Sequence, residues 1–549
     1  MNTFRRTIAF LTHPFIVLHI LFFIQLAIFL WTVIHPYTIE PQGSTYLYLR
    51  GHLVYTSYIR QAKDGAWSLF MSHTTRPMHS IYTPMFFVAL GKIAAIFNID
   101  PPVIYMASRI FASYALFLAV YWLVKVIIPK KLYSKTLHIS AILFILALEP
   151  GPFLTDLGWN PMLWKPAIFS YYPQVAVQRH FGLPHHTMGE AVGLLFLGLF
   201  FLFLSKPTLS RLWLLFVTGI AGTLILPPYF TILGIVVFIP WILYAITDKS
   251  FRKMVIPLLV SGLAVGGTAF FVYHEISKGY PYKWTNLDEK RWVANADVLI
   301  NYLSSLILYV PFISLLWISI LRLWRSFDAN LRRLISVATS WIIIPPILVP
   351  VSSLPWFPMA NFRLMDGYNY VPAGILAAFG VSYGMKIFKS RAVIGLTRGF
   401  LVSGVIFTST MLTYIYTAQI IKDQRFFWNN VYLDNSHWRA FSFLRTVPKW
   451  SGIIVMNHFG EIIPEFASVK TFLGSTPGFS DWEERFHIAT SFYSGLLTDD
   501  QARTTLQKEH ISFVYYSDEE RYYNISGTLY PNILTPIFDE GIVMIYKVK

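Results

Sequence analysis

The sequence predicts an α-helical polytopic membrane bundle of about 11 transmembrane helices, with a small extracytoplasmic α/β domain at its C-terminal end. Three observations lead to this prediction. Of the 549 residues, 55% are hydrophobic and only 13% are charged, about half the charged share of a soluble globular protein. Apolar runs of spanning length recur as far as residue 420. After residue 421 charged residues become frequent and the apolar runs shrink to strand length.

A spanning helix needs about 20 mostly apolar residues. The first candidate, Phe15–Ile34, follows two arginines and is longer than a typical signal-peptide core, so we interpret it as a retained signal anchor. Further spans are expected at 104–128, 136–149, 186–205, 210–226, 228–247, 253–276, 298–323, 331–350, 369–388 and 396–420. The segment 84–97 is too short to span, and we expect it to lie in the membrane interface or to pack on the bundle.

Charge sets the expected orientation. The net charge is +16, and short basic loops alternate with long loops of mixed charge that are rich in aromatic residues, Pro and His. Lys and Arg accumulate on the cytoplasmic side of a membrane. The N-terminus is therefore expected on the cytoplasmic side of the cytoplasmic (inner) membrane, and the C-terminal domain on its outer side. The excess of basic residues is therefore assigned to topology, and no nucleic-acid partner is expected. Pro227 and Pro228 are expected to separate two spans, since fusing them would place later basic loops outside.

The expected domains are 1–420, a transmembrane domain with a large first external loop at 35–103, and 421–549, the extracytoplasmic α/β domain. In the second domain, Ile453–Met456, Ser512–Tyr516 and Gly541–Lys547 read as strands. Ser480–Tyr493 and Thr498–His510 read as helices, and Thr498 with Asp499 forms a capping start. Strands that alternate with helices indicate a small α/β domain.

Three acids in the external segments are candidate catalytic groups. Glu40 follows the first span, Asp64 lies in IRQAKDGAW at a helix expected to end at Gly65, and Asp156 lies in the second long loop. A carboxylate in a pocket of low dielectric constant can act as a general base on an acceptor hydroxyl. The alternative for each acid is a solvated or interfacial position without chemistry.

Basic residues and histidines gather in VQRHFGLPHHTMGE, where Arg179, His180, His185 and His186 flank Pro184. Proline fits the first turn of a helix, and helix N-termini and arginines both favour phosphate. We interpret this segment as a phosphate or pyrophosphate site, with plain helix-start polarity as the alternative. His186 and Glu190 share a helix face, which leaves a metal site open, although no H-E-x-x-H motif is present. Arg363, directly before a late span, is either a phosphate contact or a snorkelling anchor.

Cofactor expectations follow from what the sequence lacks. Cysteine is absent, which excludes disulfides, thiolate metal sites and thiol nucleophiles. Neither G-x-G-x-x-G nor G-x-x-x-x-G-K-[ST] occurs, so no nucleotide is expected. The sequence leaves a divalent metal open as a cofactor. The expected donor is a membrane-borne, already activated substrate, and membrane lipids are the expected partners.

Several segments resemble the GT-C class of polytopic glycosyltransferases, in the bacterial group related to protein O-mannosyltransferases and lipid A aminoarabinose transferases. The segments are YTSYIRQAKDGAW with the following Ile99-Asp100-Pro101 turn, RHFGLPHH, RLMDGYNYVPAGILAAFGV, and the tail segments TSFYSG, LLTDDQ, ISFVYYSDEER and VMIYKVK. The resemblance implies a helical bundle with a large first external loop and an external C-terminal domain. It also implies transfer of a sugar from a polyprenyl phosphate or pyrophosphate to an acceptor at the outer face.

The resemblance further implies a catalytic Asp or Glu in the first external loop. Where an Asp is expected ahead of VYTSYIRQ, Gly51 and His52 stand instead. His52 is kept as a substrate-binding candidate, and Glu40 or Asp64 becomes the candidate base. The lipid-phosphate contacts of the family would match Arg179 and Arg363. The missing Asp leaves a non-catalytic lipid-binding scaffold as an alternative. A transporter is a further alternative, against which stand the lack of repeats and the few charges inside spans; Arg109 and Glu275 lie near span ends.

Overall fold

The computed structural model describes residues 13–39, 53–128, 135–148, 180–247, 255–283, 295–306, 309–323, 327, 329–354, 357, 359–365, 369–387, 435–474, 481–525 and 529–549. They form two compact units. Unit 1 comprises the described parts of Met1–Thr32, Arg109–Tyr273 and Lys290–Ile421. Unit 2 comprises those of Val33–Ser108, His274–Glu289 and Lys422–Lys549.

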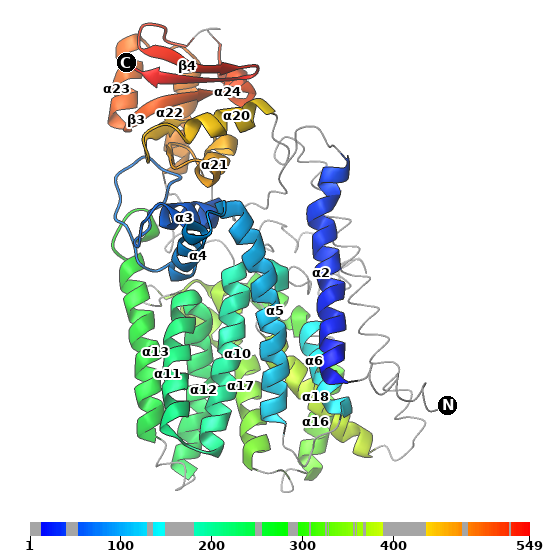
Figure 1. Cartoon of the computed structure of the whole chain (residues 1–549). Coiled ribbons are helices and arrows are strands. Elements are labelled where there is room, and N and C mark those ends of the chain that lie inside the picture. The colour runs from blue at the N-terminus through cyan, green and yellow to red at the C-terminus, as the bar shows by residue number, and fades with distance from the viewer. Residues whose placement is uncertain are drawn as a thin grey trace. The chain divides into compact units, whose positions relative to one another are not determined.

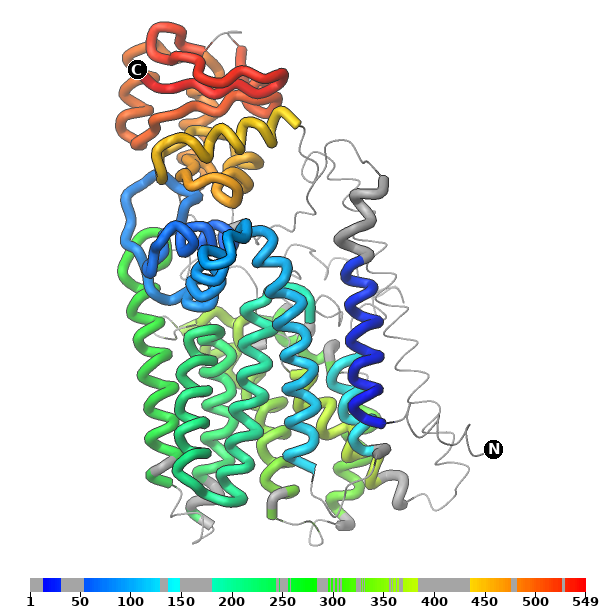
Figure 2. Tube along the Cα trace, viewed as in Figure 1, coloured from blue at the N-terminus to red at the C-terminus, as the bar shows by residue number. Residues whose placement is uncertain are grey.

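Helices dominate unit 1 (Figure 1). Their bounds, including three helices that cross the division between the units, are α2 (Pro14–Ile39), α5 (Pro101–Ile127), α6 (Lys135–Leu146), α10 (Pro184–Ser205), α11 (Leu209–Ile225), α12 (Pro227–Thr247), α13 (Val255–Ile276), α15 (Asn295–Leu306), α16 (Val310–Leu323), α17 (Ala329–Ser352), the 3-10 helix η5 (Asn361–Met365) and α18 (Tyr370–Ile387). Helices α10, α11 and α12 pack on one another, and Figure 2 shows them as neighbouring green tubes. Helix α18 packs on α6, α16 and α17.

Four helices among the described residues are long and apolar enough to cross a membrane: Pro101–Ile127, Pro184–Ser205, Leu258–Ile276 and Leu331–Ser352. Shorter apolar helices lie at most of the other predicted spans, and 396–420 falls outside the described residues. The chain is therefore a helical membrane protein, and the predicted count of about 11 spans is not confirmed. Segment 84–97 forms the short apolar helix α4 (Met85–Ile96), whose length matches the expectation of a helix too short to span.

Proline explains where two helices begin. The predicted span 298–323 is replaced by α15 and α16, and Pro311 lies in the first turn of α16. There its missing N–H removes no hydrogen bond, whereas inside one continuous helix it would remove a bond and clash with the preceding turn. The predicted separation at Pro227 and Pro228 is confirmed, since α11 ends at Ile225 and α12 begins at Pro227.

Unit 2 contains a five-stranded mixed sheet in the order β2-β1-β3-β5-β4. The strands are β1 (Gly452–Ile454), β2 (Lys470–Thr471), β3 (Ile511–Tyr516), β4 (Leu534–Glu540) and β5 (Val543–Val548). Strand β1 pairs in parallel with β2 and β3, whereas β5 is antiparallel to both β3 and β4. The flanking helices are α20 (Asn435–Leu444), α21 (Asn457–Phe466), α22 (Trp482–Tyr493), α23 (Asp499–Lys508) and α24 (Asp518–Tyr523).

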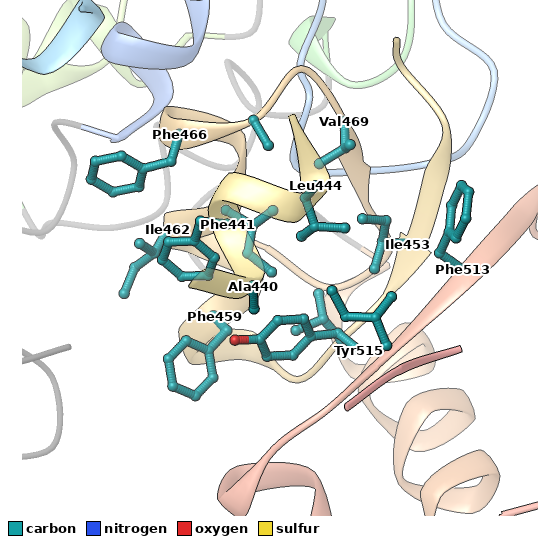
Figure 3. Close-up of a cluster of buried hydrophobic side chains, with 14 of the residues drawn as sticks. Ala440, Phe441, Leu444, Ile453, Phe459, Ile462, Phe466, Val469, Phe513 and Tyr515 are labelled. Atoms are coloured by element: carbon teal, nitrogen blue, oxygen red, sulfur yellow. The ribbon is translucent and has the colours of Figure 1, made fainter. Parts of the chain in front are cut away.

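Helices cover both faces of this sheet. Successive side chains of a strand point to opposite faces, so one strand contributes to the packing on both sides. On β3, Phe513 and Tyr515 join a buried cluster with α20 and α21 (Figure 3). Val514, between them, joins a second cluster with α22 and α23. The result is a three-layer α/β/α structure, which agrees with the small α/β domain predicted for the C-terminal part. The capping start at Thr498 is also confirmed, since its hydroxyl and Gln501 form a reciprocal capping box.

The described first-loop residues belong to the same unit. Helix α3 (Leu53–Lys63) packs on α4 and on α21. Gly91 of α4 permits the close approach, since a Cβ there would lie 2.4 Å from Ala62 Cβ. Arg60 Nε donates to the Glu465 carbonyl at 2.8 Å, and His73 Nε2 lies 3.1 Å from the Glu461 carbonyl. The predicted domain boundary near residue 421 lies outside the described residues and stays a prediction.

Among the described residues of unit 2, Arg76 makes the largest set of ion pairs. Its guanidinium contacts Asp481 at 2.6 Å, Glu484 at 3.1 Å and Glu509 at 3.2 Å. Tyr280 donates to the same Asp481 carboxylate at 3.2 Å. The side chain of Glu509 is only 4% exposed, so its charge needs the arginine as a partner. Arg76 therefore joins the segment between α3 and α4 to helix α22 and to the end of α23.

Candidate functional site

The candidate site in unit 1 is built around the N-terminal end of α10. The helix begins at Pro184, as predicted, and the backbone N–H groups of His186 and Thr187 both bond to the Leu183 carbonyl. The rings of His185 and His186 meet edge to face, with centroids 4.5 Å apart. The helix start therefore presents two adjacent imidazoles beside the positive end of a helix dipole.

Arg363 reaches this helix from a distant part of the sequence. It lies in η5, which packs on α12, α15 and α17. Its guanidinium is close enough to His186 to interact with it electrostatically. Two of the predicted phosphate-binding residues, separated by more than 170 positions in the sequence, are thus brought together.

The segment just before α10 is held by buried polar contacts. His180 is fully buried, and its Nδ1 lies 2.7 Å from Gln25 Oε1. Because Gln25 Nε2 donates to the Leu146 carbonyl at 2.8 Å, its oxygen faces the histidine, and His180 Nδ1 acts as the donor. The Thr187 hydroxyl donates to the His180 carbonyl at 3.1 Å. These bonds favour a positioning role for His180.

Arg109 fixes Phe181, the residue that follows His180. Its Nε donates to the Phe181 carbonyl at 2.6 Å, and its guanidinium lies over the Phe29 ring, 4.6 Å from the centroid. Phe29 in turn stacks on Phe181 at 4.8 Å. The buried Arg109 therefore binds the turn that precedes α10 to both α2 and α5.

A buried carboxylate lies one helical turn beyond His186. Glu190 accepts a hydrogen bond from the Tyr370 hydroxyl of α18, and Tyr229 of α12 lies within its electrostatic range. Gly193 lets Tyr229 of α12 approach α10 closely, since a Cβ there would lie 2.3 Å from the Tyr229 ring. Gly189 does the same for Leu226, the residue between α11 and α12, at 2.4 Å. Small residues of this kind let membrane helices pack tightly around polar groups.

Several predicted site residues lie outside the described residues. These are Glu40, His52, Asp156 and Arg179, so their roles stay predictions.

Asp64 is described, and it belongs to unit 2. One carboxylate oxygen accepts from Lys449 Nζ at 2.7 Å and the other from Ser468 Oγ at 2.6 Å. Helix α3 ends at Lys63 and Gly65 has a φ of +113°, a backbone conformation that favours glycine. These contacts give Asp64 a part in holding unit 2 together and favour the structural interpretation over general-base chemistry.

Three polar contributors were missed from the sequence. Gln25 is a single polar residue inside an apolar run, and Tyr370 stands at the head of a predicted span. Arg109 was noted only as a charge near a span end. A polar residue inside a membrane helix is itself a signal of function or of a buried bond, and this signal would have found Gln25. The contact between Tyr370 and Glu190 depends on tertiary packing.

A metal site built from three or more His, Asp or Glu side chains is not found within the described ranges. The two histidines at the start of α10 and Glu190 on the same helix do not form such a group. Further acids that the sequence places in external loops, Glu40 and Asp156 among them, lie outside those ranges.

Comparisons with known proteins place the fold. No family model and no curated protein sequence matches this chain. The apo crystal structure of the Archaeoglobus fulgidus oligosaccharyltransferase matches with a TM-score of 0.53 and 13% identity, over 95% of this chain and 73% of that one. The same archaeal protein with an inhibitory peptide and a dolichol-phosphate gives 0.48 and 12%, over 92% and 69%. Mycobacterial arabinofuranosyltransferase AftD gives 0.43 and 12%, over 97% and 40%.

The first of these matches carries the structural argument. It shows that the chain has the fold of that oligosaccharyltransferase, which supports the predicted GT-C-like fold. The bacterial families named from the sequence are not confirmed. At this level of identity the match concerns the fold, and the activity has to be argued from the site.

Proposed function

We propose that this protein is an integral membrane glycosyltransferase that moves a sugar from a polyprenyl phosphate or pyrophosphate to an acceptor at the outer face of the cytoplasmic membrane. The observation that carries the proposal is that Arg363 lies within electrostatic range of His186 at the start of α10, in a chain that has the fold of an oligosaccharyltransferase. A guanidinium beside a helix N-terminus is suited to hold a phosphate.

The proposed reaction is an inverting displacement at the anomeric carbon. A carboxylate removes the proton of the acceptor hydroxyl, and the oxygen attacks the anomeric carbon. The bond from that carbon to the lipid phosphate oxygen breaks, and the lipid phosphate or pyrophosphate leaves with the electron pair. General-base help of this kind contributes about 10²–10⁴ in rate.

Arg179, His186 and Arg363 are proposed to hold the leaving phosphate. Their donors would stabilise the negative charge that grows on it, which is the interaction that lowers the barrier. His185 lies against His186 and His180 is anchored to Gln25, so both are proposed to position this group. His52 is kept as a further substrate contact.

Glu40 is the proposed base. Asp156 is the second candidate, because it lies in the loop that leads to His180. Asp64 is the third, and its bonds to Lys449 and Ser468 favour a structural role. Replacing these acids one at a time separates the three possibilities, because only replacement of the base should lower the rate without weakening the fold.

The test is a sugar-transfer assay with the purified full chain in lipid and a polyprenyl-phosphate-linked sugar as donor. Arg363→Gln should lower kcat/KM by about tenfold or more, the loss expected for one charge-assisted contact. Arg439→Gln is the matched control, because that arginine makes only an exposed pair with Glu540. Glu40→Gln should lower kcat, and Asp64→Asn should lower thermal stability with kcat retained.

Two outcomes would overturn the proposal. Turnover that persists unchanged in Glu40→Gln, Asp64→Asn and Asp156→Asn would remove the acid-assisted transfer. Tight binding of the lipid without any product would favour a non-catalytic lipid-binding scaffold.

A divalent ion as cofactor is tested in the same assay. Loss of transfer with a chelator, and its return with Mg²⁺ or Mn²⁺, would assign one.

A further inference from the structure

Helix α4 of unit 2 is apolar almost all round, and Lys92 is its one charged residue. The face formed by Phe87, Val88, Gly91 and Ala94 is buried. This face packs on α3, and the two helices share one apolar cluster. A helix that is apolar on every side is normally buried on every side, so the opposite face of α4 also needs a cover.

That opposite face is exposed. Ala89, Ile93 and Ile96 follow one another at spacings of four and three residues, which places them on one side of the helix. Ala89 is exposed, Ile93 is 41% exposed and Ile96 is 77% exposed. Phe97, directly after the helix, is 69% exposed. Large apolar side chains that lie together at the surface mark a contact with a membrane or with another protein.

The next helix indicates what covers this face. After a short turn, α5 begins at Pro101, and it is one of the described helices that are long and apolar enough to cross a membrane. Its Tyr105 is fully buried in the cluster that α3 and α4 share, so α4 and the head of α5 form one packed body. Val103, on the same turn of α5, is 59% exposed. Exposed apolar side chains therefore continue from α4 into a membrane-spanning helix.

The turn between α4 and α5 suits a place with little water. Asn98 has a φ of +50°, and its N–H bonds to the Ala95 carbonyl while that of Ile99 bonds to the Ala94 carbonyl, which is the Schellman pattern of a helix end. The Ile99 carbonyl accepts a hydrogen bond from Lys63 Nζ at 2.8 Å. These three carbonyls are satisfied within the protein, as the apolar part of a membrane requires.

Side chains typical of a membrane–water boundary lie beside α4. Lys92 Nζ donates to the Gly65 carbonyl at 2.8 Å and lies 4.6 Å from the centroid of the Trp67 ring. Trp67 is 62% exposed, and Tyr82, just before α4, is 49% exposed. Tryptophan and tyrosine gather at the level of the lipid headgroups, and lysine reaches out to them from apolar surfaces. This combination favours a lipid surface over a second protein as the partner of the exposed face.

We propose that α4 lies in the membrane interface, with Ile93, Ile96 and Phe97 among the acyl chains of the leaflet on the side of unit 2. The opposite face of α4 carries α3, and α3 packs on α21 (Figure 1). Arg60 of α3 fixes that second contact through its bond to the Glu465 carbonyl. The sheet domain that contains α21 therefore rests on the membrane through α3 and α4, whatever reaction the protein performs.

The experiment uses the lack of cysteine in this chain, which makes a single introduced cysteine the only labelling site. The full chain with Ile93→Cys or Ile96→Cys carries a nitroxide label and is placed in nanodiscs of phosphatidylcholine and phosphatidylglycerol. Electron paramagnetic resonance measures how often the label collides with oxygen and with a water-soluble nickel complex. An interfacial helix buries its apolar face about 5–10 Å into the headgroup and acyl boundary, where oxygen is enriched and the nickel complex is depleted.

Leu496→Cys and Ile525→Cys are the matched controls, because these apolar side chains of unit 2 are 68% and 75% exposed and follow helices that flank the sheet. The ratio of oxygen to nickel collisions should be severalfold higher at Ile93 and Ile96 than at the two controls. Thermal unfolding verifies the fold of each labelled variant, and Ala89→Cys, on the same face of α4, replaces a variant that loses it.

Three results would overturn the proposal. Labels on α4 that show the same ratio as the controls would place this face in water. Labels that are shielded from both reagents would show that protein covers it. Among shielded labels, spin–spin broadening that disappears on dilution with unlabelled protein would assign a second copy of the chain, and shielding without broadening would assign another part of the same chain.

Discussion

The hydroxyl of Tyr370, the first residue of α18, donates a hydrogen bond to the carboxylate of Glu190 in α10. Both side chains are buried, Tyr370 at 3% and Glu190 at 2% exposed. The bond therefore connects the helix that carries the two site imidazoles with the helix that follows the Arg363 segment. A buried carboxylate is costly unless it is paired or hydrogen-bonded, so this contact bears on both stability and site geometry.

Removing that hydroxyl should destabilise the bundle more than removing one that faces a backbone carbonyl. Tyr370→Phe is expected to lose about 1–3 kcal/mol, because the buried Glu190 side chain loses a hydrogen-bond partner. The matched control is Tyr309→Phe, whose hydroxyl donates to the Phe144 carbonyl at 3.0 Å, with about 0.5–1.5 kcal/mol expected. Thermal unfolding in detergent measures both variants. Equal shifts would show that Glu190 does not depend on Tyr370.

His73 should make unit 2 sensitive to acid. Burial, with a smaller contribution from the nearby charge of Arg485, lowers the pKa of His73 to about 4, against a bond to the Glu461 carbonyl that raises it. Between pH 6.5 and 4 the unfolded chain binds a proton that the folded protein excludes. The free energy of unfolding should therefore fall as the pH drops through this window. His73→Gln should flatten that dependence, and His487→Gln, an exposed position on α22, should not.

Two adjacent acids act in the opposite direction. Burial and the neighbouring Glu520 raise the pKa of Glu519 to about 8, and burial also raises the pKa of Glu520. The folded protein then holds a proton that the unfolded chain has released, from about pH 4.5 up to pH 8. Stability should decline as the pH rises through this window. Glu519→Gln should remove most of the decline in a pH series of unfolding curves, with the exposed Glu483→Gln as control.

Arg76 should matter more than its partial exposure indicates. Arg76→Gln leaves the buried Glu509 without its guanidinium. It also removes one of the two guanidiniums from Asp481, which keeps its ion pair with Arg485 at 3.2 Å. A loss of about 3 kcal/mol is expected. Arg439→Gln breaks only an exposed pair, with about 0–1 kcal/mol expected. Chemical unfolding followed by a unit 2 signal compares the two. A loss no larger than the control would mean that solvent screens the three Arg76 pairs.

The helices were the most predictable part of the chain. Apolar runs and proline positions are local signals, and they located α10, α11, α12 and α17 closely. Strand β4 was missed because LTPIFDE contains a proline and two acids, which read as a loop. Strand β2 has two residues, which is too short to show the alternation of apolar and polar residues that predicts a strand. The apolar length of 136–149 and 298–323 predicted full spans, although the helices there are shorter.

The candidate site was predictable only in part. The histidines and Arg363 stood out because charged and polar residues are rare in this sequence. The partner of His180 could not be inferred, since Gln25 meets it across 155 positions. The same holds in unit 2, where Arg76 meets Asp481 across 405 positions. Such contacts are set by how helices and loops pack, and periodicity along the chain carries no record of them.

The order of the strands in unit 2 determines how the domain behaves toward other chains. The edge strands of its sheet are β2, with two residues, and β4, which carries Pro536, two acids and a register irregularity between Pro536 and Phe538. Short edges, proline, charge and bulges all hinder a further strand from adding to a sheet. The sheet is thereby protected at both ends against the edge-to-edge aggregation to which exposed strands are prone.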